Sequence, residues 1–279
     1  MKTEFPTYVI FVHTAPRSRV YRGMSFVSQR VGQFTYFDAV LGSPGWSGKR
    51  VLDFGGNIGN LLTHGSEIEP RNYWCLDVSR DAVEQGRERY PDAHFIFYDR
   101  YSWAFNPTGV RDLPVVDPGV RFDVIVAYSV FTHTSRAEML DLLAQLRRLL
   151  APGGVIAFTF IDPAYRHARN AEETALGYFD GTNLQWRLEK TRRLNPDADI
   201  ESMARRAATA SWITLVDDAT LFTEDDDPDH ESSADKRSYL TLCRPERMLS
   251  ILPDAHVVAP PRAAYPPPIS WEMQHCVVC

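Results

Sequence analysis

The sequence predicts an α/β protein built on a doubly wound, mostly parallel sheet. Short apolar runs of strand length alternate with segments of helical spacing between residues 49 and 161. One run, residues 122–129, is a continuous apolar stretch, as expected of a strand that is buried on both faces. Another, residues 51–54, stops at a glycine-rich turn. Ligands of such sheets bind at the carboxyl ends of the strands, so this turn marks the first candidate site.

Composition and charge restrict the classes of function that we expect. A chain of 279 residues that is 44% hydrophobic is long enough for one large core, or for a core domain with an insertion. A formal net charge of -6 gives no electrostatic reason to bind nucleic acid, so we expect no nucleic-acid partner. The N-terminal apolar run is short and is interrupted by His13. We therefore expect no signal peptide, no membrane span and a cytoplasmic location.

The cysteine pattern indicates reduced thiols. Four cysteines in a chain of this length do not make a disulfide framework, and Cys75 lies in a predicted buried strand. The terminal CVVC, residues 276–279, lacks the second ligand pair of a zinc site and continues an apolar strand. We therefore predict no metal centre from the cysteines.

The first elements are a helical cap and the strand that precedes the glycine turn. Residues 17–41 have aromatic and polar positions at helical spacing, and we assign residues 1–48 to an N-terminal cap. After the strand, Gly55, Gly56 and Gly59 permit positive φ angles and close approach of a ligand to the main chain. A helix that begins near Gly59 would direct free N–H groups toward that ligand.

The second strand, residues 72–78, ends with Asp77, which lies 22 residues beyond Gly55. An acidic residue at this spacing meets the ribose hydroxyls of a bound nucleoside in a βαβ unit. The alternative is that Asp77 or Ser79 caps the following helix, a role that both residue types favour. Both interpretations stay open at the level of the sequence.

Two further strands end in polar or aromatic residues. The third, residues 94–99, ends at Asp99, which could accept a hydrogen bond from an adenine amine, and Tyr101 and Trp103 follow it. The fourth leads into the segment VFTHT, after which Ser135 and Glu138 form a capping-box pattern ahead of an apolar helix. That helix ends at residues 152–154, and a fifth strand follows at once. Four strand exits therefore point to one crevice.

These motifs together resemble the class I S-adenosylmethionine-dependent methyltransferase family. The resemblance rests on VLDFGGNIG, LDV, YD, FDVIVAYSVFTH and LLAPGG; it covers residues 49–161 and 239–279. It implies a Rossmann-like sheet of seven strands with the last strand antiparallel. Residues 245–252 would then be the final crossover helix, and residues 256–259 and 272–279 strands six and seven. It also implies S-adenosyl-L-methionine as cofactor.

The resemblance assigns residues to the cofactor, and the position of His133 just after the fourth strand suggests a role in catalysis. Asp53 and the glycine turn would hold the methionine part, Asp77 the ribose and Asp99 the adenine. The full cofactor set is Asp53, Gly55, Gly56, Asn57, Gly59, Asp77, Val78, Asp99, Arg100 and Ser129. His133 would stand beside the methyl group as a general base, because histidine titrates near neutrality, with Tyr128 as its catalytic neighbour and Thr132 beside it. A purely structural role in the loop before Ser135 is the alternative for His133.

One departure from the family pattern is Asn57, which replaces the usual middle glycine. Asparagine tolerates left-handed angles, so the turn survives, and a cofactor without a pyrophosphate does not need that glycine. The departure weakens a nicotinamide-dependent oxidoreductase as an alternative. The fourth motif, AYSVFTH, also lacks the acidic or Asn-Pro-Pro-aromatic form of many base methyltransferases.

A long insertion separates the fifth strand from the last crossover. Residues 162–240 exceed any ordinary connection, so we expect a subdomain, with helices that include residues 203–215, that closes over the acceptor as a lid. Tyr178, Trp186 and Trp212 are its candidate apolar walls, although internal packing would explain each of them. Residues 241–279 complete the core, with residues 259–268 as an extended proline-rich connection. Whether the acidic run 224–231 binds a divalent cation is left open.

The leading function is therefore methyl transfer from S-adenosylmethionine to a small-molecule acceptor, of which secondary metabolites are one class. The alternatives are a nicotinamide-dependent oxidoreductase, or a protein that binds a nucleoside cofactor without transferring a methyl group. The sequence identifies neither the acceptor, nor the atom that is methylated, nor the oligomeric state.

Overall fold

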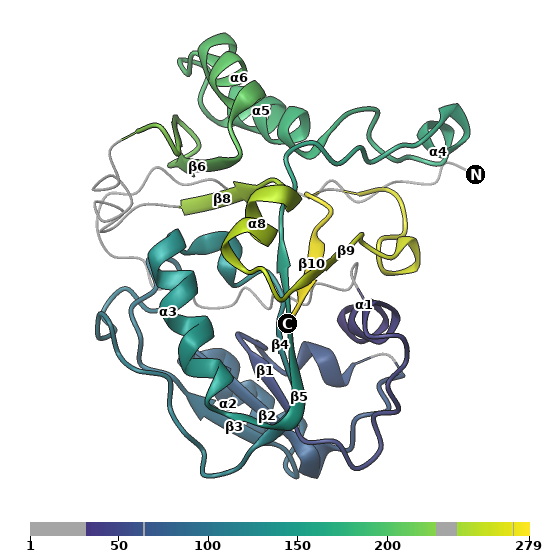
Figure 1. The fold of residues 1–279 in the computed structure, drawn as a ribbon, viewed down its shortest axis with the longest axis vertical. Helices are drawn as coiled ribbons and strands as arrows, with labels where there is room; N and C mark the ends of the chain where they lie inside the picture. Colours follow the sequence, from purple (N-terminus) through teal and green to yellow (C-terminus); the bar gives the residue numbers. More distant parts are fainter. Residues whose placement is uncertain (1–31, 64, 227–238, 270) are drawn as a thin grey trace, which may run out of the picture.

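The computed structural model describes residues 32–63, 65–226, 239–269 and 271–279. Its central feature is a seven-stranded sheet in the order β3-β2-β1-β4-β5-β10-β9 (Figure 1). The strands of this sheet are β1 (Val51–Phe54), β2 (Tyr73–Asp77), β3 (His94–Phe97), β4 (Phe122–Ala127), β5 (Leu150–Phe160), β9 (His256–Val258) and β10 (His275–Val278). The first five are parallel, and β10 runs antiparallel to both of its neighbours. The predicted fold class and the antiparallel last strand are confirmed.

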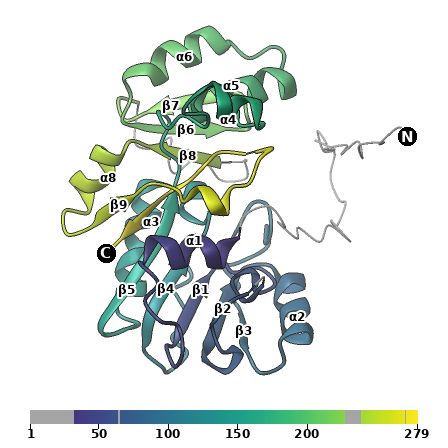
Figure 2. The same cartoon turned by 90° about the vertical axis from the view of Figure 1, so that its right-hand side faces the viewer.

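Two buried clusters cover the two faces of this sheet. On one face, Met139, Leu142 and Leu146 of α3 (Arg136–Arg147) pack with Met248 of α8 (Pro245–Ile251). On the other face lie α1 (Gln33–Val40), the 3₁₀ turn η1 (Asn60–Leu62) and α2 (Arg80–Arg89). Figure 2 shows α1 in front of the sheet, and Tyr36 of this helix is fully buried. The sheet is therefore closed off from solvent on both sides, which explains the unbroken apolar character of β4.

Two local predictions need correction. The glycine turn is followed by the single 3₁₀ turn η1 and not by an α-helix, so no helix with eight or more residues begins at Gly59. The capping box at α3 is half formed: Ser135 Oγ accepts the amide of Glu138 at 3.1 Å, but the Glu138 carboxylate pairs with Arg100 instead. A charged partner 38 residues away has displaced the local hydrogen bond.

The insertion after β5 contains a second sheet. It comprises α4 (Ala171–Ala175), α5 (Asn183–Leu194), α6 (Ile200–Thr209), β6 (Trp212–Val216) and β7 (Thr220–Thr223), and β8 (Tyr239–Cys243) completes a three-stranded sheet in the order β7-β6-β8. The prediction of a helix through residues 203–215 is thus wrong for its second half. Residues 212–216 form β6 because β7 and β8 supply the backbone partners on both sides.

This second sheet is joined directly to the first. Ile161, which follows β5, forms a parallel bridge with Leu242 of β8, and the Cys243 amide donates to the Ile161 carbonyl at 2.9 Å. In Figure 1 the insertion lies above the sheet edge, beyond the upper ends of β4 and β5. The insertion therefore lies at the carboxyl ends of these strands.

The proline-rich connection is folded and not simply extended. Residues 259–268 contain the 3₁₀ turn η4 (Arg262–Ala264), which packs near α1, and Tyr265 is 1% exposed. The expectation of an extended connection is therefore corrected. Among the described residues, no helix has the length and apolar character needed to cross a bilayer.

Candidate active site

The glycine turn after β1 is built on a sequence of left-handed residues. Gly55, Asn57 and Gly59 have φ angles of 78°, 55° and 85°. Asn57 occupies the left-handed region as the sequence analysis predicted for an asparagine, and its side-chain oxygen accepts the amide of Ile58 at 2.8 Å. At Gly56, a Cβ atom would lie 2.5 Å from the carboxylate of Asp53. The turn is thus pressed onto Asp53, and no larger residue fits at Gly56.

Asp53 is a buried carboxylate with one oxygen left over. It is 1% exposed, and Oδ2 accepts the hydroxyl of Tyr73 at 2.7 Å. Oδ1 is buried and has no hydrogen-bond partner among the described residues. Burial raises the pKa of Asp53 to about 7, against the opposing hydrogen bond from Tyr73. An unpaired oxygen in this position favours a ligand that brings a hydrogen-bond donor or a positive charge.

Asp77 connects the glycine turn to the start of α2. Its Oδ2 accepts the amide of Asn57 at 2.8 Å, and its Oδ1 accepts the amide of Ser79 at 2.7 Å. Ser79 in turn caps α2, because its hydroxyl accepts the amide of Ala82. Of the two residues that the sequence offered as helix caps, Ser79 is the cap of α2. Asp77 is held beside the glycine turn instead. Each carboxylate oxygen keeps one acceptor site for a ligand hydroxyl.

The residues after β3 are less uniformly placed. Asp99 is exposed and accepts a hydrogen bond from Asn106 at 3.0 Å, so it remains accessible at the sheet edge. Arg100 is 6% exposed, and its guanidinium is held by Glu138 at 2.8 Å and by the Leu113 carbonyl at 2.8 Å. Its side chain is thus committed to the support of α3, and its main-chain amide and carbonyl are bonded to the Tyr98 carbonyl and to Asn106. Val78, after β2, is half-buried against the α3 face of the sheet.

The exit of β4 approaches the glycine turn closely. Ser129 has a φ of 56°, and the residue after it, Val130, would collide at 2.5 Å with any Cβ atom at Gly55. His133 ends the 3₁₀ turn η3 (Phe131–His133) and is exposed. Thr132 is buried, and its hydroxyl contacts Ser129 Oγ at 3.1 Å. The predicted residues of this segment thus lie at the edge where the parallel strands end.

Tyr128 belongs to a buried aromatic group that the sequence analysis missed. Its hydroxyl lies 2.6 Å from the hydroxyl of Tyr265, and the ring of Tyr36 packs edge-on against it at 5.5 Å. Burial raises the pKa of Tyr128 well above its usual value, so it is a neutral phenol at physiological pH. It can donate or accept a hydrogen bond but does not serve as a base. The unassigned aromatic residues of the cap and of the proline-rich connection were the signal for this group.

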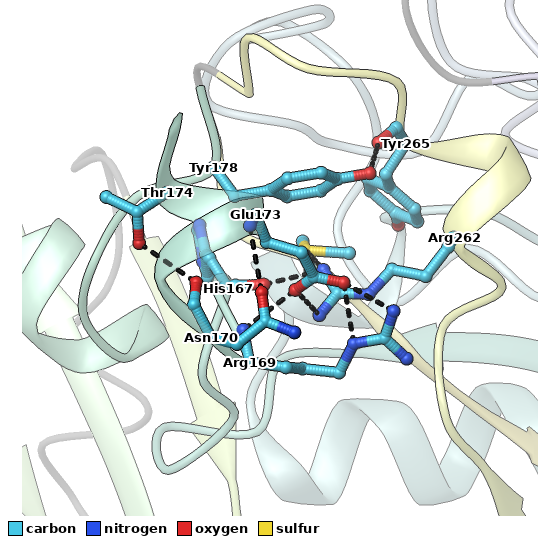
Figure 3. A network of polar contacts seen from close by, with 9 residues as sticks. His167, Arg169, Asn170, Glu173, Thr174, Tyr178, Arg262 and Tyr265 are labelled. Atoms are coloured by element: carbon cyan, nitrogen blue, oxygen red, sulfur yellow. Dashed lines mark hydrogen bonds and ion pairs between the residues drawn. The ribbon is translucent and has the colours of Figure 1, made fainter. Parts of the chain in front are cut away.

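An ion-pair network joins the insertion to the segment that carries Tyr265 (Figure 3). The Glu173 carboxylate accepts from Arg169 Nε at 2.7 Å and from Arg262 at 3.0 Å. Arg262 also donates to the His167 carbonyl at 2.6 Å and lies 4.8 Å from the centre of the Tyr178 ring. The Tyr178 hydroxyl donates to the main chain of Tyr265 at 3.1 Å, as Figure 3 shows.

The three predicted walls of the lid differ in position. Tyr178 is in the network just described, whereas Trp212 is 3% exposed and belongs to the hydrophobic cluster on the α3 face of the main sheet. Trp186 is half-buried and packs against Arg187 and Lys190 on its own helix. Of these residues, only Tyr178 contacts the segment that holds Tyr265.

The described part of the acidic run makes contacts within the protein. Glu224 accepts the amides of Ser211 and Trp212 at 2.6 and 2.9 Å, and Asp226 pairs with Arg206. Residues 227–231 of the predicted run lie outside the described residues. Within the described ranges there is no group of three His, Cys, Asp or Glu side chains arranged to hold a metal ion.

The core of the chain matches a known family model, and solved structures resemble the chain. Residues 52–156 match the family model described as a methyltransferase domain. Solved structures that are similar to this chain include the DhpI-SAM-HEP complex. It is 13% identical, with a TM-score of 0.42 and with 84% of this chain and 80% of that chain covered. The glycopeptide N-methyltransferase MtfA with S-adenosyl-L-homocysteine is 12% identical, with a TM-score of 0.45 and 89% of each chain covered. DesVI of Streptomyces venezuelae is 24% identical over 40% of this chain and 46% of that chain, with a TM-score of 0.31.

The domain match spans β1, the glycine turn, Asp77, the exit of β4 and most of β5. The sheet has the seven strands and the antiparallel last strand that the family resemblance implied. The match therefore confirms the family resemblance over the core, and it favours a methyltransferase over the oxidoreductase alternative. The chain contains, over residues 52–156, a methyltransferase domain of the class I S-adenosylmethionine-dependent type.

Proposed function

We propose that the protein transfers the methyl group of S-adenosylmethionine to a small-molecule acceptor held at the carboxyl ends of β4 and β5. One observation carries the proposal. Two buried carboxylates, Asp53 and Asp77, border the glycine turn, and neither has a cationic partner in the described part of the chain. A cofactor that carries an ammonium group, a sulfonium centre and ribose hydroxyls supplies the positive charge and the donors that these carboxylates lack.

The residues fit this cofactor part by part. Asp53 would hold the α-amino group, because its carboxylate packs against the turn at Gly56 and its Oδ1 is left without a partner among the described residues. Asp77 would accept the ribose hydroxyls, since the amides of Asn57 and Ser79 already fix its orientation. The main chain of Val78 and Arg100 and the accessible carboxylate of Asp99 would border the adenine. Gly55, Gly59 and Ser129 shape the main chain around the methionine part.

The cofactor supplies an electrophilic methyl group on a sulfonium centre, so the protein has to orient the acceptor, exclude water and receive a proton. Tyr128 and Tyr265 form a buried hydroxyl pair that donates or accepts hydrogen bonds while both stay neutral, because burial raises the pKa of each phenol. His133 is the proposed general base, since it is exposed at the end of η3 and imidazole titrates near neutrality.

The insertion provides the roof of the proposed acceptor site. Asn183 of α5 donates to the carbonyls of Asp162 and Met273 at 2.9 and 2.8 Å, which ties this roof to the ends of β5 and β10. These contacts favour a fixed wall for the part of the insertion around residues 162–183. Closure of residues 162–240 as a lid over the acceptor stays a prediction.

The proposal is tested first by binding and then by transfer. The purified protein should melt at a higher temperature with S-adenosylhomocysteine and show no shift with NAD, because a ligand that binds only the folded state stabilises it. Labelled methyl should then appear in a small molecule when the protein is incubated with labelled cofactor and a metabolite extract. A binding protein without activity would give the shift but no labelled product.

The change His133→Asn tests the base once an acceptor has been found by this route. A general base contributes roughly 100- to 10,000-fold, so turnover should fall by a factor in this range while the affinity for S-adenosylhomocysteine is kept. Turnover within about threefold of the parent would remove His133 from the chemistry and leave positioning as the source of the rate. Thr241→Val, which deletes a buried hydroxyl bonded to the Thr134 carbonyl near η3, controls for simple loosening of this loop.

A further inference from the structure

Ser129 adopts a costly backbone conformation at the point where β4 meets the cofactor side of the sheet. Its φ of 56° is in the left-handed region, which a residue with a Cβ atom occupies only when its surroundings hold it there. This conformation turns the chain so that the Val130 side chain reaches Gly55, where even one added Cβ atom would approach it to 2.5 Å. The conformation of Ser129 therefore sets how closely the exit of β4 approaches the glycine turn.

A closed ring of three hydrogen bonds holds Ser129. Its amide donates to Thr159 Oγ1 at 2.7 Å, Thr159 Oγ1 donates to Gln274 Oε1 at 2.5 Å, and Gln274 Nε2 donates back to Ser129 Oγ at 3.1 Å. Thr159 and Gln274 are 0% and 6% exposed. Both polar atoms of the Gln274 carboxamide therefore act on Ser129. Nε2 bonds the Ser129 hydroxyl directly, and Oε1 holds the Ser129 amide through Thr159.

The main chain of Gln274 is held independently of its side chain. Its carbonyl accepts the hydroxyl of Tyr36 in α1 at 2.8 Å, and its amide donates to the Tyr265 hydroxyl at 3.2 Å. The residue therefore occupies a fixed position just ahead of β10 whatever its side chain does. A change of the side chain alone breaks the ring and leaves these two anchors in place.

We propose that Gln274 is a positioning residue for methyl transfer: through Thr159 and Ser129 it fixes the approach of Val130 to Gly55, and so the shape of the cofactor site. The inference rests on the proposed function, because the cofactor is what occupies the space beside the glycine turn. Gln274 does not touch the reacting atoms. It acts through Ser129, whose conformation it holds.

The test uses substitutions of matched size. Gln274→Met removes both polar ends of the side chain at nearly constant volume, and Thr159→Val removes the hydroxyl that links Gln274 to the Ser129 amide. Thr159→Ser keeps that hydroxyl and serves as the conservative rescue. Gln145→Met is the control, because Gln145 also holds a main-chain amide, that of Val115 at 2.7 Å, but does so on α3, outside the proposed site.

Two measurements are made on the full chain. Hydrogen exchange at the Ser129 amide should be about tenfold faster in Gln274→Met and in Thr159→Val, because its acceptor is misplaced or lost. The affinity for S-adenosylhomocysteine, measured by calorimetry, should fall by about tenfold in the same two variants. Thr159→Ser and Gln145→Met should stay within about twofold of the parent in both measurements.

The outcomes separate this inference from the proposed function. Unchanged exchange at Ser129, or faster exchange with unchanged affinity, in either disruptive variant overturns the positioning role. The positioning role is also overturned if Gln145→Met weakens the affinity as much as Gln274→Met does, because the effect would then be general loosening. If the parent itself fails to bind S-adenosylhomocysteine, the proposed function fails, and the exchange data still decide whether Gln274 holds Ser129. If Gln274→Met does not fold, the pair Thr159→Val and Thr159→Ser decides the question.

Discussion

Two regions of the molecule bury carboxylates in opposite ways. Beside the glycine turn, Asp53 and Asp77 receive hydrogen bonds from one phenol and two main-chain amides of the described residues. At the junction between the insertion and the segment before β10, Glu173 and Glu272 pair with arginines, with Arg187 Nε 2.5 Å from Glu272. Arginine hydrogen bonds lower the pKa of Glu173, whereas burial raises the pKa of Asp53.

The two kinds of carboxylate have different roles, one in the stability of the fold and one in ligand binding. A buried carboxylate with its own arginine is complete, and it joins two parts of the chain. A buried carboxylate without a cation lowers stability unless a ligand compensates it. The paired region therefore holds the insertion in place, and the unpaired region is the part of the molecule that we propose binds a cationic cofactor.

The largest effect on stability is expected from Arg187→Met. Its guanidinium is buried between Glu272 and Asp218, so the change leaves an uncompensated carboxylate and should lower the free energy of unfolding by about 3–5 kcal/mol. Denaturant unfolding with and without S-adenosylhomocysteine checks this. The ligand affinity of the folded variant should be unchanged, and a loss of affinity of the same size would show that the two regions are not independent.

Asp77→Ala, in contrast to Arg187→Met, should act mainly on cofactor binding. Loss of hydrogen bonds to a charged acceptor should weaken the binding of S-adenosylhomocysteine by about 2–3 kcal/mol in calorimetry. The matched control is Asp123→Ala, since Asp123 Oδ2 also accepts a main-chain amide, that of Arg50 at 2.8 Å, at the amino end of β4. Equal affinity of parent and Asp77→Ala would remove Asp77 from the site.

Asp53→Asn should change the pH dependence of stability. The folded pKa of about 7 lies above the unfolded value near 4, so the folded state binds the proton more tightly and the parent loses stability as pH rises from about 4 to 7. The asparagine variant lacks this loss, so its stability relative to the parent should grow by about 2 kcal/mol between pH 5 and 8. A constant difference across this range, measured by denaturation, would contradict the raised pKa.

Asp53→Asn should also change the pH dependence of ligand binding. A ligand with an ammonium group favours ionised Asp53, so the parent should bind S-adenosylhomocysteine more tightly at pH 8 than at pH 5. Asp53→Asn should show weaker and nearly pH-independent binding over the same range. If parent and variant follow the same curve, the ammonium group is held elsewhere.

The smallest effect is expected from Ser79→Ala. Its hydroxyl caps α2 through the Ala82 amide at 3.3 Å, so the change should cost about 1 kcal/mol of stability. Affinity for S-adenosylhomocysteine should be unaffected, because the Ser79 amide that orients Asp77 is retained. A loss of affinity comparable with that of Asp77→Ala would mean that the cap and the ribose site are a single unit.

Local patterns were sufficient for the main sheet and for the glycine turn after β1. The boundaries of β1, β2 and β4 follow from apolar runs that end in glycine, acidic or polar residues, and Asn57 adopts the left-handed angle expected of it. Local patterns failed where partners are distant. Residues 212–216 follow an alanine-rich helix and resemble its continuation, but β8, more than 20 residues later, pairs with them as a strand.

The sequence by itself thus determined the order along the chain of the strands in the main sheet, the glycine turn and the carboxylates at the strand ends, because these depend on residues close together in the chain. Only the tertiary structure decided how the site is supported. Gln274 meets Ser129 across 145 residues, and Tyr265 meets Tyr128 across 137. Hydrogen bonds over such separations have no periodicity or spacing in the sequence, since they form only after β10 and the proline-rich connection have packed beside β5 and α1.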